Sequence, residues 1–298
     1  MMRREMSIEK RKKVYGYIFT SPFILGSLLF FAYPIIMSLV FSFSQYKNLA
    51  NINEMKFIGL ANYIEAFFVN VNFVPAFLTV IRDTLLNTPL IVLFSLFLAF
   101  CLNKEMRGRV VYRTLLFLPF ILGSGLIFKY LMFTGDTETT MELINGIATP
   151  SVIQSMFGPK VSNLFSVFFS RITIVLWKSG LQILLFLSAL QNISPSLYES
   201  AKCDSATEWE IFWHITIPMV SPMILINIVY TIIDSFSDVN NKVMLYFEQV
   251  AFSSLRFDFA AAMSWIYFLF IMLLISLVFL IMRRRVFYSA VVGKGGRR

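Results

Sequence analysis

Long apolar runs separated by shorter polar segments dominate the chain. Six of these runs are close to, or longer than, the roughly 20 residues with which a helix crosses a bilayer. We expect membrane-spanning helices over residues 14–43, 84–102, 110–133, 164–190, 219–238 and 259–282. The first run is longer than a bilayer needs and contains Pro22 and Pro34, so it should be tilted, kinked or protruding. The pattern predicts an all-α integral membrane protein with six transmembrane helices.

Basic residues set the expected orientation of these helices. Residues 1–13 contain six Lys and Arg residues, the segment 103–113 contains four, and the segment 283–298 contains six. Segments rich in Lys and Arg beside membrane helices stay in the cytoplasm. We therefore expect a basic cytoplasmic arm over 1–13, a membrane domain over 14–282 and a basic cytoplasmic tail over 283–298. Residues 45–80 and 134–163 should then lie outside.

Composition excludes an ordinary soluble domain. The chain has 298 residues, is 57% hydrophobic and 14% charged, and carries a formal net charge of +9. A soluble domain is nearer half apolar and a quarter charged. Because the basic residues lie beside apolar runs, the positive-inside rule accounts for them and no nucleic-acid partner is expected.

A polar island over residues 194–218 separates the fourth and fifth apolar runs. Ser196 and Glu199 have the spacing of a capping box, and Ser205 and Glu208 repeat it. This spacing predicts one short helix over about 197–203, a break at Asp204 and Ser205, and a second helix over about 206–216. Pro218 should end the second helix, because proline lacks the N–H that a helix interior needs.

The residues of this island resemble a known motif. The runs Glu199-Ser200-Ala201 and Asp204-Ser205-Ala206, followed by Phe212, Ile215 and Pro218, resemble the EAA motif of ABC importer permeases. The resemblance implies the type I importer fold, with this segment as a cytoplasmic coupling helix-turn-helix that seats in an ATPase subunit. Two residues depart from the motif: Ser200 replaces Ala, and Ser205 replaces Gly. Ser205 predicts a differently shaped break, because glycine tolerates positive φ and serine does so reluctantly. The alternative is an ordinary surface helix-turn-helix in which Glu199 only caps.

Further signatures resemble the carbohydrate-uptake branch of the same family. They are Ser21-Pro22-Phe23 in the first run, Phe57-Ile58-Gly59-Leu60-Ala61-Asn62-Tyr63 after it, Arg113-Thr114-Leu115 at the third run and Phe259-Ala260-Ala261-Ala262-Met263-Ser264 at the sixth. The resemblance implies a multi-pass protein of the bacterial plasma membrane, surrounded by lipid and with both termini cytoplasmic. It also implies a heterodimer with a second, similar permease, two ATPase subunits, an extracellular solute-binding protein and a carbohydrate substrate.

The chain itself lacks the equipment for ATP hydrolysis. No Gly-x-x-x-x-Gly-Lys-Ser/Thr phosphate loop occurs in the sequence. We therefore expect no cofactor in this chain, with ATP and Mg²⁺ bound by the partner ATPases. The single histidine, His214, has no nearby Cys or acidic cluster, so neither a metal site nor a catalytic triad is expected.

Polar residues inside or at the end of two apolar runs are candidates for a substrate pathway. They are Trp177 and Lys178 in the fourth run, and Asp234, Asp238, Asn240 and Asn241 at the end of the fifth. Ionisable residues within a membrane line a pathway or pair with another charge. One interpretation is a polar cavity in which Trp177 stacks on a sugar. The other is a Lys178–Asp234 ion pair that holds two helices together.

The substrate is expected to be an oligosaccharide. Carbohydrate permeases often have a Gly-Gly-Pro turn after the fifth span, where this chain has residues 238–243 with Asp, Val, Asn, Asn, Lys and Val. In this it looks more like the subgroup that imports complex or uronate-containing oligosaccharides. A secondary transporter would need an ion-coupling site and inverted repeats, and a membrane enzyme would need converging catalytic groups. Neither is evident in the sequence.

Overall fold

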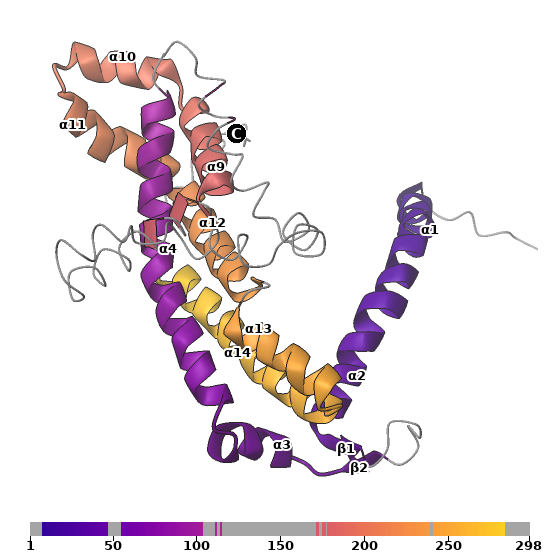
Figure 1. Cartoon of the computed structure of the whole chain (residues 1–298). Coiled ribbons are helices and arrows are strands. Elements are labelled where there is room, and N and C mark those ends of the chain that lie inside the picture. Colours follow the sequence, from indigo (N-terminus) through magenta and orange to yellow (C-terminus); the bar gives the residue numbers. More distant parts are fainter. Residues whose placement is uncertain are drawn as a thin grey trace, which may run out of the picture. The chain divides into compact units, whose positions relative to one another are not determined.

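The computed structural model describes residues 8–46, 55–103, 111, 114, 171–172, 175–176, 178–238 and 241–283 (Figure 1). The predicted third span lies outside the described residues apart from Val111 and Thr114, and the predicted fourth span is described only from residue 171, with gaps. Trp177 and Asn240 also lie outside them. The chain divides into two compact units, one of residues 1–77 and 242–270 and the other of residues 78–241 and 271–298. Each unit is described by itself below.

The first unit begins with one long helical run. It consists of α1 (Ile8–Ser27), a π-helical turn η1 (Leu28–Ala32) and α2 (Tyr33–Ser42). The stretch Tyr15–Ser42 is apolar enough to cross a membrane, as the sequence predicts. Large side chains point outward along it, including Phe19, Phe23 and Phe30. A helix that is apolar and unburied needs a nonaqueous surrounding, which a bilayer supplies.

A small antiparallel sheet follows this helix, which the all-α expectation missed. β1 (Ser44–Tyr46) pairs with β2 (Met55–Phe57), with Gln45 opposite Lys56. Gly59 then turns the chain with φ +63°, a conformation that glycine adopts without a steric penalty. The turn leads into α3 (Ala61–Ile64) and the π-helical η3 (Glu65–Val69).

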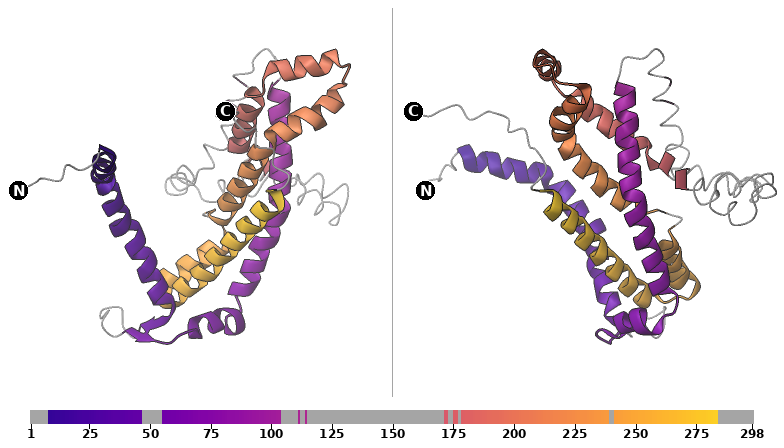
Figure 2. Two further views of the ribbon diagram at one scale, coloured as in Figure 1. Left: turned by 180° about the vertical axis from the view of Figure 1, so that it is seen from behind. Right: turned by 90° about the vertical axis from the view of Figure 1, so that its left-hand side faces the viewer.

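Aromatic side chains form the core of the first unit. α13 (Lys242–Glu248) and η5 (Gln249–Ser253) precede α14 (Phe257–Met282), and Figure 2 shows α13 beside the first part of α14. Phe73 lies 6.2 Å from Phe247, and Phe247 lies 5.6 Å from Tyr267, measured between ring centroids. Phe77 stacks on Phe73 at 5.6 Å. These contacts join the loop after the first span to the helical hairpin before and within the last span.

α4 (Phe73–Asn103) begins well before the predicted start near Thr84. Hydropathy placed the boundary after Arg82 and Asp83, but two other effects extend the helix. The Asn70 side-chain oxygen accepts hydrogen bonds from the N–H groups of Asn72 and Phe73, which satisfies donors at the helix start. Phe73 and Phe77 are also buried, so tertiary packing stabilises the added turns.

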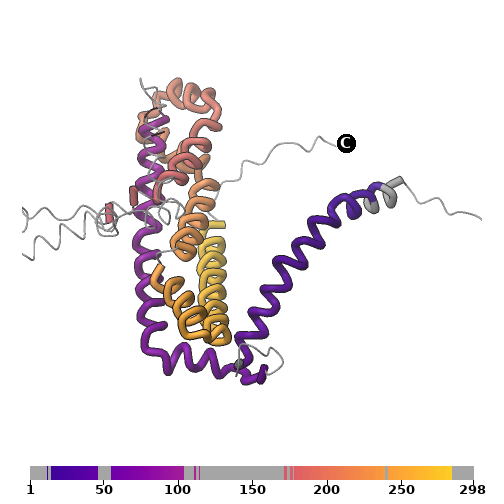
Figure 3. Tube along the Cα trace, turned by 45° about the vertical axis from the view of Figure 1, so that its right-hand side comes forward, coloured from indigo at the N-terminus to yellow at the C-terminus, as the bar shows by residue number. Residues whose placement is uncertain are grey.

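The second unit packs α9 (Gly180–Gln191) and α12 (Ile217–Phe236) with the later part of α4 (Figure 3). Its buried core draws on all three helices. The members are Val92, Leu96, Ala99 and Leu102 of α4, Ile183, Phe186, Leu187 and Leu190 of α9, Val220 of α12 and Ile193 just after α9.

Two short helices follow α9 and lead into α12. They are α10 (Pro195–Cys203) and α11 (Glu208–Ile211), and a π-helical turn η4 (Phe212–Thr216) joins α11 to α12 without a gap. The prediction that Pro218 ends the second helix is wrong. The N–H of Ile217 bonds the carbonyl of Phe212, five residues back. This wider turn precedes the proline and relieves the clash of its ring with the preceding turn, so the helix continues.

Within the described residues, four helices are long and apolar enough to cross a membrane. They are Tyr15–Ser42, Phe73–Asn103, Glu208–Phe236 and Phe257–Met282, with the shorter apolar helix Gly180–Gln191 beside them. They coincide with the predicted first, second, fifth and sixth spans, although three of the four begin or end several residues away from the predicted bounds.

Candidate functional site

The break segment, residues 194–218, begins at a helix cap that differs from the predicted one. Ser194 is the N-cap of α10 and Pro195 occupies the first helical position, where a missing N–H does no harm. Ser196 therefore lies inside the helix, and its hydroxyl contacts the Ser194 hydroxyl at 2.8 Å. The predicted capping box of Ser196 and Glu199 is wrong, because the spacing does not reveal that proline fixes the start two residues earlier.

The break between α10 and α11 is a Schellman motif. The N–H of Ala206 bonds the carbonyl of Ala201, and the N–H of Ser205 bonds the carbonyl of Lys202, both at 3.0 Å. These are the two bonds that define the motif, with Ser205 at the position that is usually glycine. Ser205 has φ +60°, so it adopts the left-handed conformation in spite of its side chain. The serine thus preserves the backbone shape that a glycine would give, and the differently shaped break that we expected is not seen.

The second helix begins with a capping box, two residues later than predicted. The Thr207 hydroxyl accepts a hydrogen bond from the N–H of Glu210 at 3.3 Å, and the Glu210 carboxylate accepts one from the N–H of Thr207 at 2.8 Å. The predicted box of Ser205 and Glu208 is therefore wrong, since Ser205 is already used in the preceding turn. Glu208 instead pairs with Lys202 across the break at 3.5 Å.

The surface of the break segment is acidic and exposed, whereas its other side is anchored. Glu199, Ser200, Asp204 and Ser205 are exposed, and Ala201 and Ala206 are half-buried. Figure 1 shows α10 and α11 meeting at a sharp turn. The Tyr198 hydroxyl contacts the Thr216 hydroxyl at 3.3 Å, which joins α10 to the start of the α12 run.

Aromatic rings connect the second helix of the break segment to α4. Phe212 meets Phe100 edge to face at 5.4 Å and Trp213 at 5.3 Å. Trp209 lies 6.3 Å from Phe212 and remains largely exposed. Such edge-to-face pairs contribute about 0.5–1.5 kcal/mol beyond their buried area. The segment is therefore fixed to α4 and α12 and still presents a bulky face to its surroundings.

A charged cluster lies where α12 faces the residues just before α9. The Lys178 ammonium is 2.6 Å from the Asp238 carboxylate and 3.4 Å from the Asp234 carboxylate. All three side chains are about a quarter to a third exposed. The two carboxylates outnumber the ammonium, so the charged cluster carries a formal charge of −1.

Asn241 ends the helix that carries these carboxylates. Its side-chain amide donates to the carbonyl oxygens of Ser235 at 3.1 Å and Phe236 at 3.3 Å. These are carbonyls of the last turn of α12, which have no partner within the helix. The Asn241 amide nitrogen therefore serves as a C-terminal cap in this structure.

Buried polar side chains form a seam between α9 and α12. The Gln182 amide donates to the Thr231 hydroxyl at 3.1 Å, and that hydroxyl donates to the carbonyl of Asn227 at 2.7 Å. Asn227 is fully buried, and neither polar atom of its side chain has a partner among the described residues. The Gln182 side-chain oxygen is in the same situation. Unsatisfied buried groups cost free energy, so they mark places where function or a further contact intervenes.

A family model decides the class of the protein. Residues 58–287 match the model described as "Binding-protein-dependent transport system inner membrane component". The chain belongs to this family of ABC transporter permeases. It is a multi-pass membrane protein and a transport subunit rather than an enzyme, as the sequence predicts.

Curated relatives of this permease carry the names of sugar transporters. It is 29% identical to the probable ABC transporter permease protein YesP of Bacillus subtilis, with 93% of each chain covered. It is 33% identical to the arabinooligosaccharides transport system permease protein AraP of the same organism, over 76% of this chain and 70% of the relative. It is 27% identical to the lactose transport system permease protein LacF of Rhizobium radiobacter, over 94% and 97%. The permease is thus of the carbohydrate-uptake type.

Solved structures confirm the fold. This permease resembles a chain in the crystal structure of a bacterial alginate ABC transporter in complex with an alginate pentasaccharide-bound periplasmic protein. The TM-score is 0.64 at 20% identity, with 93% of this chain and 96% of that chain covered. The fold is therefore that of the type I ABC importer permeases, all-α apart from the β1–β2 hairpin.

Sequence reasoning missed two polar groups of this permease. Arg171 donates to the Asn87 side-chain oxygen at 2.5 Å and to the Asp83 carboxylate at 3.1 Å. The signal was present, because Arg171 and Asp83 are opposite charges at apolar runs that must find partners. The seam of Gln182, Asn227 and Thr231 gave no comparable signal, since isolated amides and hydroxyls in an apolar run do not reveal which of them are buried together.

Proposed function

We propose that this permease belongs to an ATP-driven importer and that the break segment receives the stroke of separate ATPase subunits. The observation that supports this best is the Schellman break between α10 and α11, which presents Glu199, Asp204 and Ser205 on an exposed turn. These residues occupy the EAA-like motif of a chain that has no phosphate loop of its own. Both termini and the break segment lie in the cytoplasm in this proposal.

The structure supplies a route by which a push on the break segment reaches the membrane. α11, η4 and α12 form one uninterrupted helix from Glu208 to Phe236. Tyr198 joins α10 to this helix, and Phe212 joins it to Phe100 of α4. Closure of ATP-loaded ATPases would displace the segment and bias the spans between inward-open and outward-open arrangements, a two-state change driven by ligand binding at a distance.

The partners follow from the same proposal. A second, similar permease completes the translocation path, and two ATPase subunits bind ATP and Mg²⁺. An extracellular solute-binding protein delivers the substrate. The similar alginate transporter was solved in complex with a periplasmic protein, which supports this last partner.

The charged cluster and the polar seam are our candidates for the wall of the substrate path in this subunit. Lys178, Asp234 and Asp238 already satisfy one another, so their first role is to hold α12 against the residues before α9. Gln182 and Asn227 retain unused hydrogen-bonding atoms that sugar hydroxyls could engage. Between these two groups, the seam is the better candidate for substrate contact.

The substrate is an oligosaccharide in this proposal. Relatives named for arabinooligosaccharides and lactose, and a neighbour named for alginate, support this class. The narrower hypothesis of a uronate-containing sugar rests on residues 238–243. The charged cluster, at −1, gives a uronate no added attraction. Binding of neutral and uronate oligosaccharides to the cognate solute-binding protein, measured by calorimetry, separates the two.

Co-purification with the ATPase subunits tests the role of the break segment. Glu199→Lys reverses one charge on the exposed face of α10, and it should abolish co-purification in detergent while the permease stays in the membrane. Glu248→Lys is the matched control, since it reverses one charge on an exposed face of α13. Equal retention of the ATPases by both variants would contradict the proposed coupling role.

A further inference from the structure

The short helix after the first span, Ala61–Val69, has its polarity reversed. Asn62 and Ala66 are buried, with 2% and 0% of their surface exposed, and Glu65 is turned inward with them. Ile64, Phe67 and Phe68 point outward, and Phe68 is 85% exposed. A helix on the surface of a soluble protein has the opposite arrangement. The outward face therefore requires an apolar surrounding.

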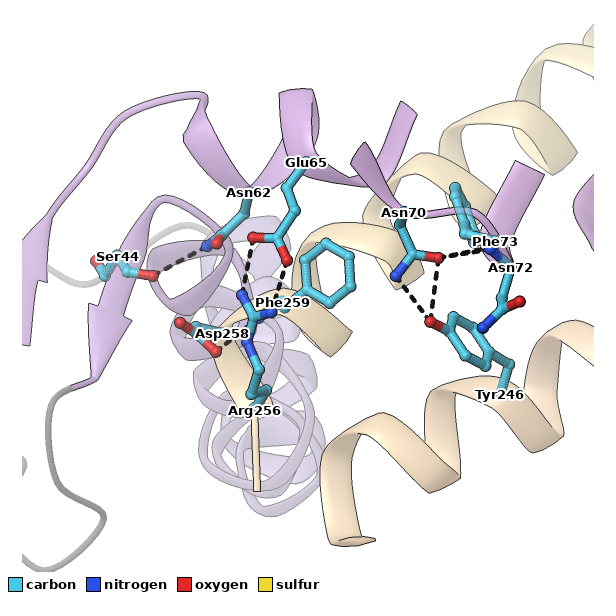
Figure 4. Close-up of polar contacts among 10 residues, drawn as sticks. All are labelled: Ser44, Asn62, Glu65, Asn70, Asn72, Phe73, Tyr246, Arg256, Asp258 and Phe259. Atoms are coloured by element: carbon cyan, nitrogen blue, oxygen red, sulfur yellow. Dashed lines mark hydrogen bonds and ion pairs between the residues drawn. The ribbon is translucent and has the colours of Figure 1, made fainter. Parts of the chain in front are cut away.

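Asn62 attaches this helix to the end of the first span. Its side-chain amide donates to the carbonyls of Ser42 at 3.1 Å and Ser44 at 3.0 Å, and Figure 4 shows it reaching toward Ser44. The Tyr63 hydroxyl contacts the Ser42 hydroxyl at 2.8 Å. Ser42 is the last residue of the membrane-crossing stretch Tyr15–Ser42. The helix is thus held at the level where that stretch ends.

Glu65 attaches the helix to the start of the last span. The Arg256 guanidinium donates to both carboxylate oxygens of Glu65, at 2.6 and 2.9 Å (Figure 4). It also lies 4.6 Å from the centroid of the Phe259 ring. The hydrogen bonds from Arg256 lower the pKa of Glu65, and Glu65 raises the pKa of Arg256. Arg256 immediately precedes the membrane-crossing helix Phe257–Met282.

Asn70 attaches the other end of the helix to a third span. Its side-chain oxygen accepts from the N–H of Phe73 at 2.8 Å, and its amide donates to the Tyr246 hydroxyl at 2.8 Å (Figure 4). Phe73 is the first residue of the membrane-crossing helix Phe73–Asn103. Three residues cannot reach farther than about 11 Å, so the chain from Val69 to Phe73 keeps the short helix near this level.

We propose that Ala61–Val69 is an interfacial helix whose apolar face, Ile64, Phe67, Phe68, Val69 and Val71, lies in the outer leaflet of the bilayer. The ends of three membrane-crossing stretches fix its depth, and its face continues the exposed apolar surface of α2 and α4. The face contains no charged or polar side chain, whereas a protein interface is surrounded by a polar rim. Lipid at the boundary of the acyl chains and headgroups fits it best. The outer side follows from the proposed orientation, but the depth does not depend on ATP coupling.

A spin label tests this placement in the assembled importer in lipid vesicles. Phe68→Cys is labelled in a background with Cys101→Ser and Cys203→Ser, and Lys56→Cys on the exposed side of β2 is the matched control. Collision with oxygen should exceed collision with a water-soluble nickel chelate severalfold at position 68, and the order should be reversed at position 56. Val71→Cys, at a site that is 81% exposed, should give the same result as position 68.

Three other results would overturn the proposal. Predominant collision with the nickel chelate at positions 68 and 71 would place the helix in water. Low collision with both reagents would place it against the second permease. A loss of oxygen collision only when the solute-binding protein is added would make it a docking surface for that protein.

Discussion

At the scale of single residues, Ser205 shows how a departure from a motif can leave the backbone unchanged. The Schellman bonds of Ala206 and Ser205 hold the chain at φ +60° in the absence of a glycine. The sequence correctly predicted a break at Asp204 and Ser205. It could not predict the shape of that break, because a serine in the left-handed region is stabilised by neighbours that spacing does not reveal.

Replacing Ser205 with glycine should stabilise the break. An L-residue in the left-handed conformation is less stable by about 1 kcal/mol, and Ser205→Gly removes most of this strain. Ser200→Gly, in the interior of α10, should instead destabilise that helix by about 0.5 kcal/mol. Hydrogen exchange at the amides of residues 201–206 in the isolated permease measures both. Faster exchange in Ser205→Gly than in the wild type would contradict the account.

The charged cluster predicts unequal losses from its members. Asp234→Asn leaves Lys178 paired with Asp238 at the shorter distance, so the free energy of unfolding should fall by less than about 1 kcal/mol. Lys178→Gln leaves two carboxylates without their cation and should cost more. Thermal unfolding in detergent compares the variants, and Asp238→Asn serves as the intermediate case. An equal effect of Asp234→Asn and Lys178→Gln would show that the pairing does not stabilise α12.

At the scale of elements, proline proved a poor indicator of where helices end. η1 and η4 each finish two residues before a proline, Pro34 and Pro218, and in both places the helix continues. The insertion of a π-helical turn removes the conflict between the proline ring and the preceding carbonyl. Hydropathy identified the spans but not these turns, and it also missed the start of α4, which depends on Asn70 and on aromatic packing.

The cap of α11 should stabilise the second half of the break segment. Thr207→Ala removes the hydroxyl that accepts from the N–H of Glu210 and should cost about 1 kcal/mol. Thr207→Ser keeps the hydroxyl and is the control. Hydrogen exchange at the amides of residues 208–211 reports the difference. Identical protection in the two variants would mean that tertiary contacts alone hold α11.

The pair of Glu65 and Arg256 predicts a pH dependence. The folded state lowers the pKa of Glu65 below its ordinary value of 4.5, so the pair stabilises the fold above that pH. The contribution should disappear as the pH falls through the lowered pKa. Because both side chains are partly exposed, we expect no more than about 1 kcal/mol at neutral pH. The gap in thermal midpoint between wild type and Glu65→Gln should therefore close on acidification; a gap that widened would contradict this assignment.

At the scale of the whole molecule, the sequence predicted the class of protein better than the details of its site. Hydrophobic runs and basic flanks identified a multi-pass helical protein, and the EAA-like residues identified the permease family, which the family match confirms. The seam of Gln182, Asn227 and Thr231 could not be predicted, because it depends on how α9 and α12 are rotated against each other. The reversed polarity of Ala61–Val69 was likewise hidden in a segment that appeared simply polar and mixed.

The most direct test of the central claim is a cross-link from the break to an ATPase subunit. Ser205→Cys, in a background with Cys101→Ser and Cys203→Ser, carries a photoactivatable maleimide in the assembled importer, and Lys56→Cys is the control. We predict that position 205 captures an ATPase subunit and is protected from membrane-impermeant thiol reagents added outside intact cells, whereas position 56 behaves in the opposite way. Labelling of position 205 from outside, or no capture of an ATPase from it, would contradict the account.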